Sequence, residues 1–183
     1  MSQGYHHGDL RRALLDEAVR LIDDRGPTGV TMRELARRTG VTHAAPMHHF
    51  GDRRGLLTAM AVEGLELLTA AMRTARHAGF DEVAVAYVRF ARAHPGHYAV
   101  MHRPELLDAN APDLVEARAA AARELAGGVR TIPEERRRHV SSEEAAQIAW
   151  AMVHGLASLL GEGTLPEESA ETVTRRAAHQ LFG

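Results

Sequence analysis

The sequence of 183 residues contains no cysteine. Disulfides, thiolate nucleophiles and cysteine-ligated zinc are therefore excluded together, and the composition suits a reducing compartment. The chain has 45% hydrophobic residues, which suffices for a packed core without such cross-links. We therefore expect the hydrophobic core to stabilise the fold without covalent cross-links.

Long apolar runs are also absent. The longest, 145–160, is shorter than the roughly 20 residues that cross a bilayer, and His154 interrupts it. The first residues, MSQGYHHGDLRRALL, lack the apolar stretch of a signal peptide because Asp9 and Arg11 break it. The sequence therefore predicts a cytoplasmic protein without membrane contact.

The net charge of -2 is unevenly distributed along the chain. Residues 1–60 hold nine Arg against seven acidic residues, whereas the remainder holds thirteen against seventeen. An excess of two charges is compatible with a nucleic-acid-binding N-terminal part, but an ordinary solvated surface is the commoner explanation of so small an excess. Charge alone therefore leaves both interpretations open.

Helical periodicity runs through the whole chain, with no strand pattern and no repeat. An amphipathic helix over 9–25, which Asp9 can cap, ends at Gly26 and Pro27. Thr31 and Glu34 form a capping-box pattern at the start of a short helix over 31–39. This short helix is the first of two that we expect to flank one sharp turn.

That next helix follows Gly40, which permits the positive φ of a tight turn. It is predicted over 42–50, with Thr42 as its cap and Pro46 straining its first turns. Asp52 can cap a long fourth helix that ends at Gly79. Further helices are predicted over 81–94, 97–109, 113–130, 143–160 and 167–182, and Ser141 or Ser142 can cap the one over 143–160.

The predicted fold class is therefore all-α, with about nine helices. An N-terminal helix-turn-helix domain (1–52) is joined by the long helix to a helical body (53–183). The short-helix pair has the shape of a DNA reader, because the turn lets one helix rest on the backbone while the other enters the major groove. Helical corners of this shape also occur in proteins that never touch DNA.

Two stretches of the sequence resemble a known family. The first, VTMRELARRTGVTHAAPMHHFGDRRGLL over 30–57, resembles the DNA-binding head of the TetR family of bacterial repressors. The second, AWAMVHGLASLL with Trp150, His154 and Gly155, is similar to the Trp-His-Gly signature of one C-terminal ligand-binding subclass of that family, and Tyr98 to Met101 resembles its Tyr-x-x-Met segment.

The resemblance implies a set of DNA-binding residues on the second and third helices and just after them. Arginine can clamp phosphate or guanine, and threonine and histidine can donate to either. The implied residues are Thr31, Arg33, Thr42, His43, Ala44, Pro46, Met47, His48, His49 and Arg53. Met47 departs from the family, because the usual residue is a tyrosine that bonds phosphate. That contact is either missing or supplied by His48 or His49.

The resemblance also implies a homodimer that pairs through its last two helices, a double-stranded palindromic operator as partner, and release by a small-molecule effector. Methionine and aromatic residues of the body are candidates for an adaptable ligand cavity, although bundle core is their commoner role. The candidate ligand-binding residues are Met72, Tyr87, Phe90, Tyr98, Met101, Trp150 and His154.

Twelve histidines invite a metal or catalytic hypothesis, but their arrangement argues against both. No H-E-x-x-H motif occurs, and the pairs His6–His7 and His48–His49 point in different directions from a helix. One cluster merits a test, the histidines 94, 97 and 102 with Glu105. No cofactor, metal or enzymatic activity is predicted; the alternative is a helical carrier of a small molecule or metal that has lost DNA binding.

Overall fold

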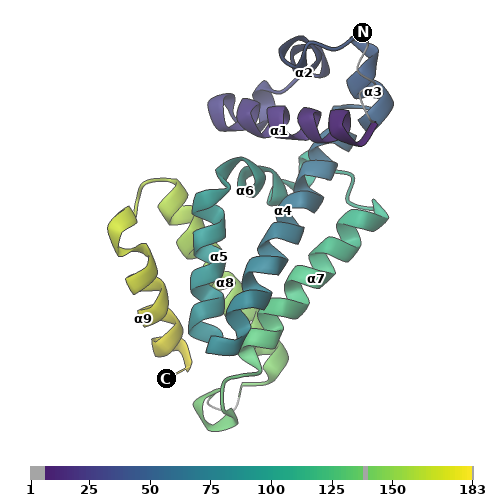
Figure 1. Cartoon of the computed structure of the whole chain (residues 1–183). Helices are drawn as coiled ribbons and strands as arrows, with labels where there is room; N and C mark the ends of the chain where they lie inside the picture. The colour runs from purple at the N-terminus through teal and green to yellow at the C-terminus, as the bar shows by residue number, and fades with distance from the viewer. Residues whose placement is uncertain (1–6, 138–139, 183) are drawn as a thin grey trace. The chain divides into compact units, whose positions relative to one another are not determined.

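The computed structural model describes residues 7–137 and 140–182, so His6 of the predicted histidine pair lies outside it. Over the described ranges the chain is helical without any strand, which confirms the all-α prediction (Figure 1). The described α-helices are α1 (His7–Arg25), α2 (Met32–Thr39), α3 (Ala44–Phe50), α4 (Arg53–Ala75), α5 (Phe80–Ala93), α6 (Pro95–Met101), α7 (Pro112–Val129), α8 (Ser142–Gly161) and α9 (Ala170–Phe182).

Short 3-10 helices occupy several connections. They are Pro27–Gly29, Arg76–Ala78, Pro104–Leu106, Glu134–Arg137 and Glu167–Ser169.

The chain packs as two compact units. The first contains residues 1–64 and 96–115, and the second contains 65–95 and 116–183. The unit boundary therefore falls inside α4 and inside α7, and α6 packs with the N-terminal helices. The division by function at residue 52 stays a prediction, because packing units and functional domains need not share a boundary.

The first unit has an aliphatic core to which α6 contributes. Leu14, Leu35 and Leu56 are fully buried. A Cβ on Gly64 of α4 would lie 2.7 Å from the Met101 Sδ, so only glycine lets α6 approach α4 this closely. The close approach also places α6 against the rest of the N-terminal helices.

In the second unit, α5 packs against both α8 and α9. Its buried side chains include Val83, Tyr87 and Phe90. Glu124 of α7 is buried too, and its carboxylate accepts hydrogen bonds from Arg73 at 2.9 Å and from Arg76 at 3.2 Å. Two arginine partners thus provide the hydrogen bonds that a buried carboxylate needs.

Several helix ends follow the predicted signals. The Asp52 Oδ1 accepts the Gly55 amide at 2.8 Å, and Ser141 with Glu144 forms a complete capping box at the start of α8. Asp9 does not cap α1, because that helix already begins at His7. The predicted boundary there was too late by two residues.

The helix predicted over 97–109 is shorter in the structure. It begins at Pro95, where a missing amide costs nothing, and ends at Met101. Pro104 disfavours helical geometry at Arg103, whose φ is -117 and ψ is 77, and a 3-10 turn follows.

One described helical stretch, Arg53–Ala78, is long and apolar enough to cross a membrane by length and composition. Over half of its most apolar window, 56%, is buried inside the protein. A core helix passes the same test, and this burial is typical of one.

Candidate nucleic-acid interface

The start of α2 is fixed by Thr31, whose Oγ1 accepts the Glu34 amide at 3.2 Å. The return half of the predicted capping box is replaced by ion pairs, because the Glu34 carboxylate accepts Arg37 at 2.8 and 2.9 Å and Arg38 at 3.3 Å. Chiefly the hydrogen bonds from Arg37 lower the pKa of Glu34 to about 2. Glu34 is therefore charged near neutral pH, and it balances the charge of Arg37.

The turn after α2 depends on Gly40, with φ 68 and ψ 24 in the left-handed region. The Val41 amide donates to the Ala36 carbonyl at 3.1 Å, which closes the end of the helix. A side chain at position 40 would strain this backbone, since left-handed geometry favours glycine. Gly40 thus sets the direction in which α3 leaves α2.

The third helix begins at Ala44, two residues after the predicted start at 42. Its N-cap is His43, in helical geometry and without a side-chain cap, so Thr42 does not cap it. Pro46 is the third helical residue, where an amide has no intrahelical partner, so the proline removes no intrahelical hydrogen bond.

The ten predicted DNA-binding residues differ in exposure. The exposed ones include Met47, with 46% of its surface accessible, an unusual degree for a methionine. His49 and Arg53 are half-buried, and Pro46 is buried, so its ring packs inside the unit. The exposed residues are Thr31, Arg33, Thr42, His43, Ala44, Met47 and His48.

Arg53 has partners within the protein. Its Nε donates to the Val30 carbonyl at 2.8 Å and its Nη2 to the Pro27 carbonyl at 2.6 Å. The guanidinium thereby ties the start of α4 to the segment that leads into α2. These two bonds reach back 23 and 26 residues, and no local sequence pattern predicts them.

Helix α1 contacts both α2 and α3. Arg38 of α2 donates to the Glu17 carboxylate of α1 at 3.2 Å. The guanidinium carbon of Arg11 lies 5.4 Å from the centre of the Phe50 ring, a cation–π distance. The last turn of α2 and the last residue of α3 are therefore both held to α1.

The predicted ligand-binding residues are divided between the two units. Tyr98 and Met101 belong to the first; the other five belong to the second. Met72 and Tyr87 are buried in the core, which is their commoner role, whereas Trp150 is 50% exposed and stacks on His154 with ring centres 5.2 Å apart. Burial lowers the pKa of His154.

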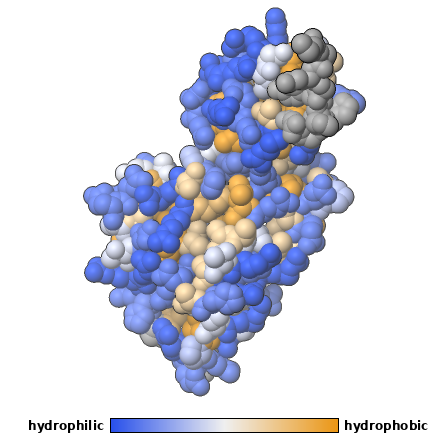
Figure 2. All heavy atoms as spheres, in the orientation of Figure 1, coloured by the Kyte–Doolittle hydropathy of each residue, from blue (hydrophilic) through white to orange (hydrophobic). Residues whose placement is uncertain are grey.

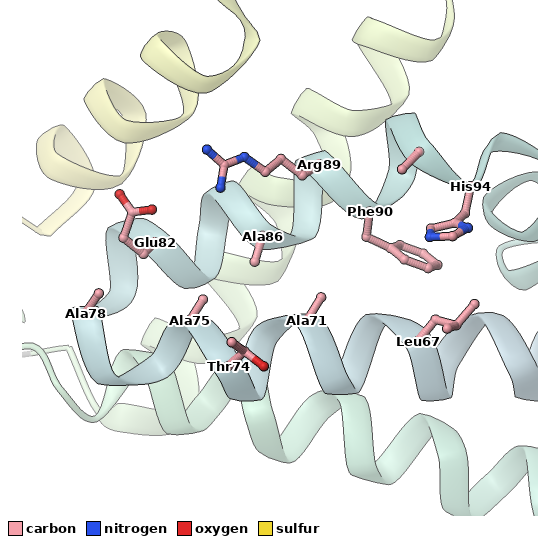
Figure 3. Close-up of a pocket in the computed structure, with 11 residues that line it drawn as sticks. Leu67, Ala71, Thr74, Ala75, Ala78, Glu82, Ala86, Arg89, Phe90 and His94 are labelled. Atoms are coloured by element: carbon pink, nitrogen blue, oxygen red, sulfur yellow. The ribbon is translucent and has the colours of Figure 1, made fainter.

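A hollow of about 530 Å³ lies between α4 and α5 in the second unit (Figure 3). Apolar surface is visible over these two helices in Figure 2. Phe90 is the one predicted ligand-binding residue among those that line the hollow, which are Leu67, Ala71, Thr74, Ala75, Ala78, Glu82, Ala86, Arg89, Phe90, Ala93 and His94.

The histidine cluster proposed for metal does not form. Residues 7–137 and 140–182 contain no group of three or more metal-ligating side chains. The His97 Nε2 lies 3.2 Å from the Glu63 carboxylate, and the His102 Nδ1 lies 3.2 Å from the Tyr98 carbonyl. Both imidazoles therefore have hydrogen-bond partners within the first unit.

Known families match both parts of the chain. The family described as bacterial regulatory proteins, tetR family, matches residues 14–60, and the family described as tetracyclin repressor-like, C-terminal domain, matches residues 80–181, more than half of the chain.

Among solved structures, a protein of unknown function from Rhodococcus sp. RHA1 is 34% identical over 99% of this chain and 97% of that one, with a TM-score of 0.83. The TetR family transcriptional regulator PfmR from Thermus thermophilus shares the fold, with a TM-score of 0.71 and 23% identity over 92% of this chain and 96% of its own.

Curated relatives match the head. The HTH-type transcriptional regulator BetI of Rhizobium meliloti (strain 1021) is 49% identical over 49 residues, which are 27% of this chain and 24% of the relative. BetI of Burkholderia thailandensis is 41% identical over 70 residues, 38% of this chain and 35% of the relative. The chain thus spans about a quarter to a third of the length of these relatives.

The head matches a family of bacterial regulatory proteins, and the body matches a repressor-like C-terminal domain. The chain belongs to the TetR family of bacterial regulatory proteins.

Proposed function

We propose that this regulator is a cytoplasmic, homodimeric repressor that binds a palindromic operator through α3 and leaves it when a small molecule binds the body. The exposure of α3 carries this proposal, because Ala44, Met47 and His48 present side chains to solvent from a helix that the Gly40 turn and α1 hold in place. An exposed methionine there is unexplained by packing and is suited to contact with bases.

The exposed residues divide by chemistry. The Thr31 and Thr42 hydroxyls and the Arg33 guanidinium suit phosphate oxygens, which position a protein on DNA. His43 and His48 can donate to phosphate or base edges. Met47 and Ala44 are apolar and suit the thymine methyl group in the major groove. Arg53 is assigned a positioning role because two of its donors are already used.

The dimer is proposed through α8 and α9, with the body assigned to the Trp-His-Gly subclass. Ile148, Trp150 and Leu159 of α8 are 39%, 50% and 40% exposed, which is costly for apolar side chains in a lone protomer. An added Cβ on Gly155 would meet nothing within 4 Å, so the helix offers a flat place for close approach. A second copy would bury these exposed side chains symmetrically.

The dimer is tested by Trp150→Glu, with the equally exposed Val115→Glu of α7 as the matched control. Light scattering should report a dimer for the wild type and the control, and a monomer for Trp150→Glu. If Trp150→Glu stayed dimeric at every concentration, α8 would not be part of the dimer interface.

The DNA-binding proposal is tested by selecting bound duplexes from a random pool with the full chain. We expect an inverted repeat whose half-sites lie one helical turn, or a multiple of it, apart. Arg33→Ala should weaken binding to all sequences, whereas Arg130→Ala, an exposed arginine of the second unit, should not. A protein that retains no duplex yet holds a ligand would instead be the carrier.

A further inference from the structure

The hollow between α4 and α5 is bounded on its long sides by small residues. Ala71, Ala75 and Ala78 of α4 and the adjoining turn face Ala86 of α5 across it (Figure 3). Because alanine side chains are small, they leave open the space that larger side chains would fill. At about 530 Å³ the hollow falls within the range of about 300–1,000 Å³ that small-molecule sites occupy.

The ends of the hollow differ from its sides. Phe90 and His94 lie at one end with ring centres 5.1 Å apart, and Leu67 of α4, 39% exposed, lies near them. The residues from Leu67 to Ala78 span about 16 Å along a helix, from 1.5 Å per residue. The site is therefore elongated, with an aromatic end wall.

Two charged residues border the hollow, but their charges are directed elsewhere. Figure 3 shows the Glu82 carboxylate and the Arg89 guanidinium pointing away from α4. Arg89 donates to both Glu171 oxygens at 2.6 Å, and Arg175 donates to the Glu82 oxygens at 2.8 and 3.3 Å.

These four side chains form an alternating network between α5 and α9 with no net charge. The hydrogen bonds from Arg175 lower the pKa of Glu82, and those from Arg89 lower the pKa of Glu171. A charged ligand would have to break one of these pairs to be neutralised. The walls instead suit a molecule that needs no counter-charge.

We propose that the α4–α5 hollow is the effector site and that it binds an uncharged, elongated, largely apolar molecule. This inference rests on the proposed ligand-responsive function. The apolar body of the ligand lies along the alanines, and its end contacts the Phe90 and His94 rings. Binding draws its free energy from apolar surface removed from water on both partners.

The experiment uses the full chain and a neutral fluorescent probe, Nile red, displaced by three ten-carbon competitors. n-Decanol is uncharged, decanoate is anionic and decyltrimethylammonium is cationic. We expect n-decanol to displace the probe at a concentration at least tenfold below the other two. Equal or tighter displacement by a charged competitor would overturn the assigned ligand class.

The position of the site is tested by Ala71→Trp, which fills the hollow from α4, and by Ala70→Trp, its exposed neighbour outside it, as the matched control. Ala86→Trp fills the hollow from the facing helix and serves if Ala71→Trp does not fold. Filling variants should lose at least tenfold in affinity for Nile red and n-decanol, with the control unchanged. Unchanged affinity in both filling variants would overturn the proposal.

Two further measurements distinguish failure of the proposed ligand site from failure of the proposed repressor function. Duplex retention by each variant without ligand reports DNA binding alone, so a protein that binds n-decanol but no duplex keeps the site and loses the proposed repressor role. If Ala71→Trp changes the oligomeric state while affinity for the probe is intact, the hollow is a contact between copies and the effector-site proposal fails.

Discussion

Arg53→Ala removes two hydrogen bonds that a charged donor makes to the carbonyls of Val30 and Pro27. Net contributions of charge-assisted bonds are about 1.5–3 kcal/mol each, and half-burial favours the lower value. We therefore expect a loss of about 3 kcal/mol in the free energy of unfolding. For a chain of this size the melting temperature should fall by about 6–12 °C, from roughly 2–4 °C per kcal/mol.

The same substitution distinguishes positioning from phosphate binding. A residue that neutralises a phosphate contributes about 0.9 to the slope of log K against log salt. Arg33→Ala should lower that slope by this amount, because Arg33 is exposed on α2. Arg53→Ala should weaken duplex binding and leave the slope unchanged.

Arg53→Lys sharpens the distinction, because lysine keeps the charge but lacks the planar fork that reaches two carbonyls. If Arg53 only positions the helices, Arg53→Lys should lower the melting temperature and the duplex affinity as Arg53→Ala does. Fluorescence anisotropy over a salt series and thermal unfolding provide the two readouts. A slope that falls in Arg53→Ala as it does in Arg33→Ala, with the melting temperature unchanged, would refute the reasoning.

Three further outcomes are expected. His48→Gln should weaken duplex affinity measured by anisotropy severalfold, because His48 is exposed on α3, whereas the exposed His77→Gln of the second unit should not. The pKa of Glu82 is lowered in the folded state by Arg175, so its stabilisation is present above about pH 4.3 and lost as pH falls further. Glu82→Gln should therefore cost about 0.5 kcal/mol at pH 7 by denaturant unfolding, with the difference vanishing in acid. Gly128→Ala should lower stability by about 1 kcal/mol in urea unfolding, because its Cβ would lie 3.0 to 3.1 Å from a buried valine of α5, and overpacking of about 1–3 kcal/mol exceeds the helix propensity gained.

Local signals in the sequence were sufficient to predict most of the helices. Gly40 with its left-handed φ, Asp52 at the start of α4 and Ser141 with Glu144 each act within a few residues, so their effect is readable from the chain itself. The starts of α1 and α3 each differ by two residues from the predicted starts, which is within the one or two residues by which helix ends vary.

The remaining features depend on contacts between distant segments. The sequence predicts Arg53 as a DNA-binding residue, and nothing nearby in sequence indicates that it also donates to backbone carbonyls of the α1–α2 connection. Tyr98 and Met101 were grouped with the body, whereas α6 packs with the first unit. The hollow depends on how the alanines of α4 and α5 oppose one another, and helical periodicity carries no such information.

The central claim is that α3 contacts the bases. The most direct measurement is the base preference of His48→Ala across a selected operator, position by position. The account predicts that preference is lost at the same one or two base pairs of each half-site and is kept elsewhere. A preference profile identical to that of the wild type at every position would contradict it.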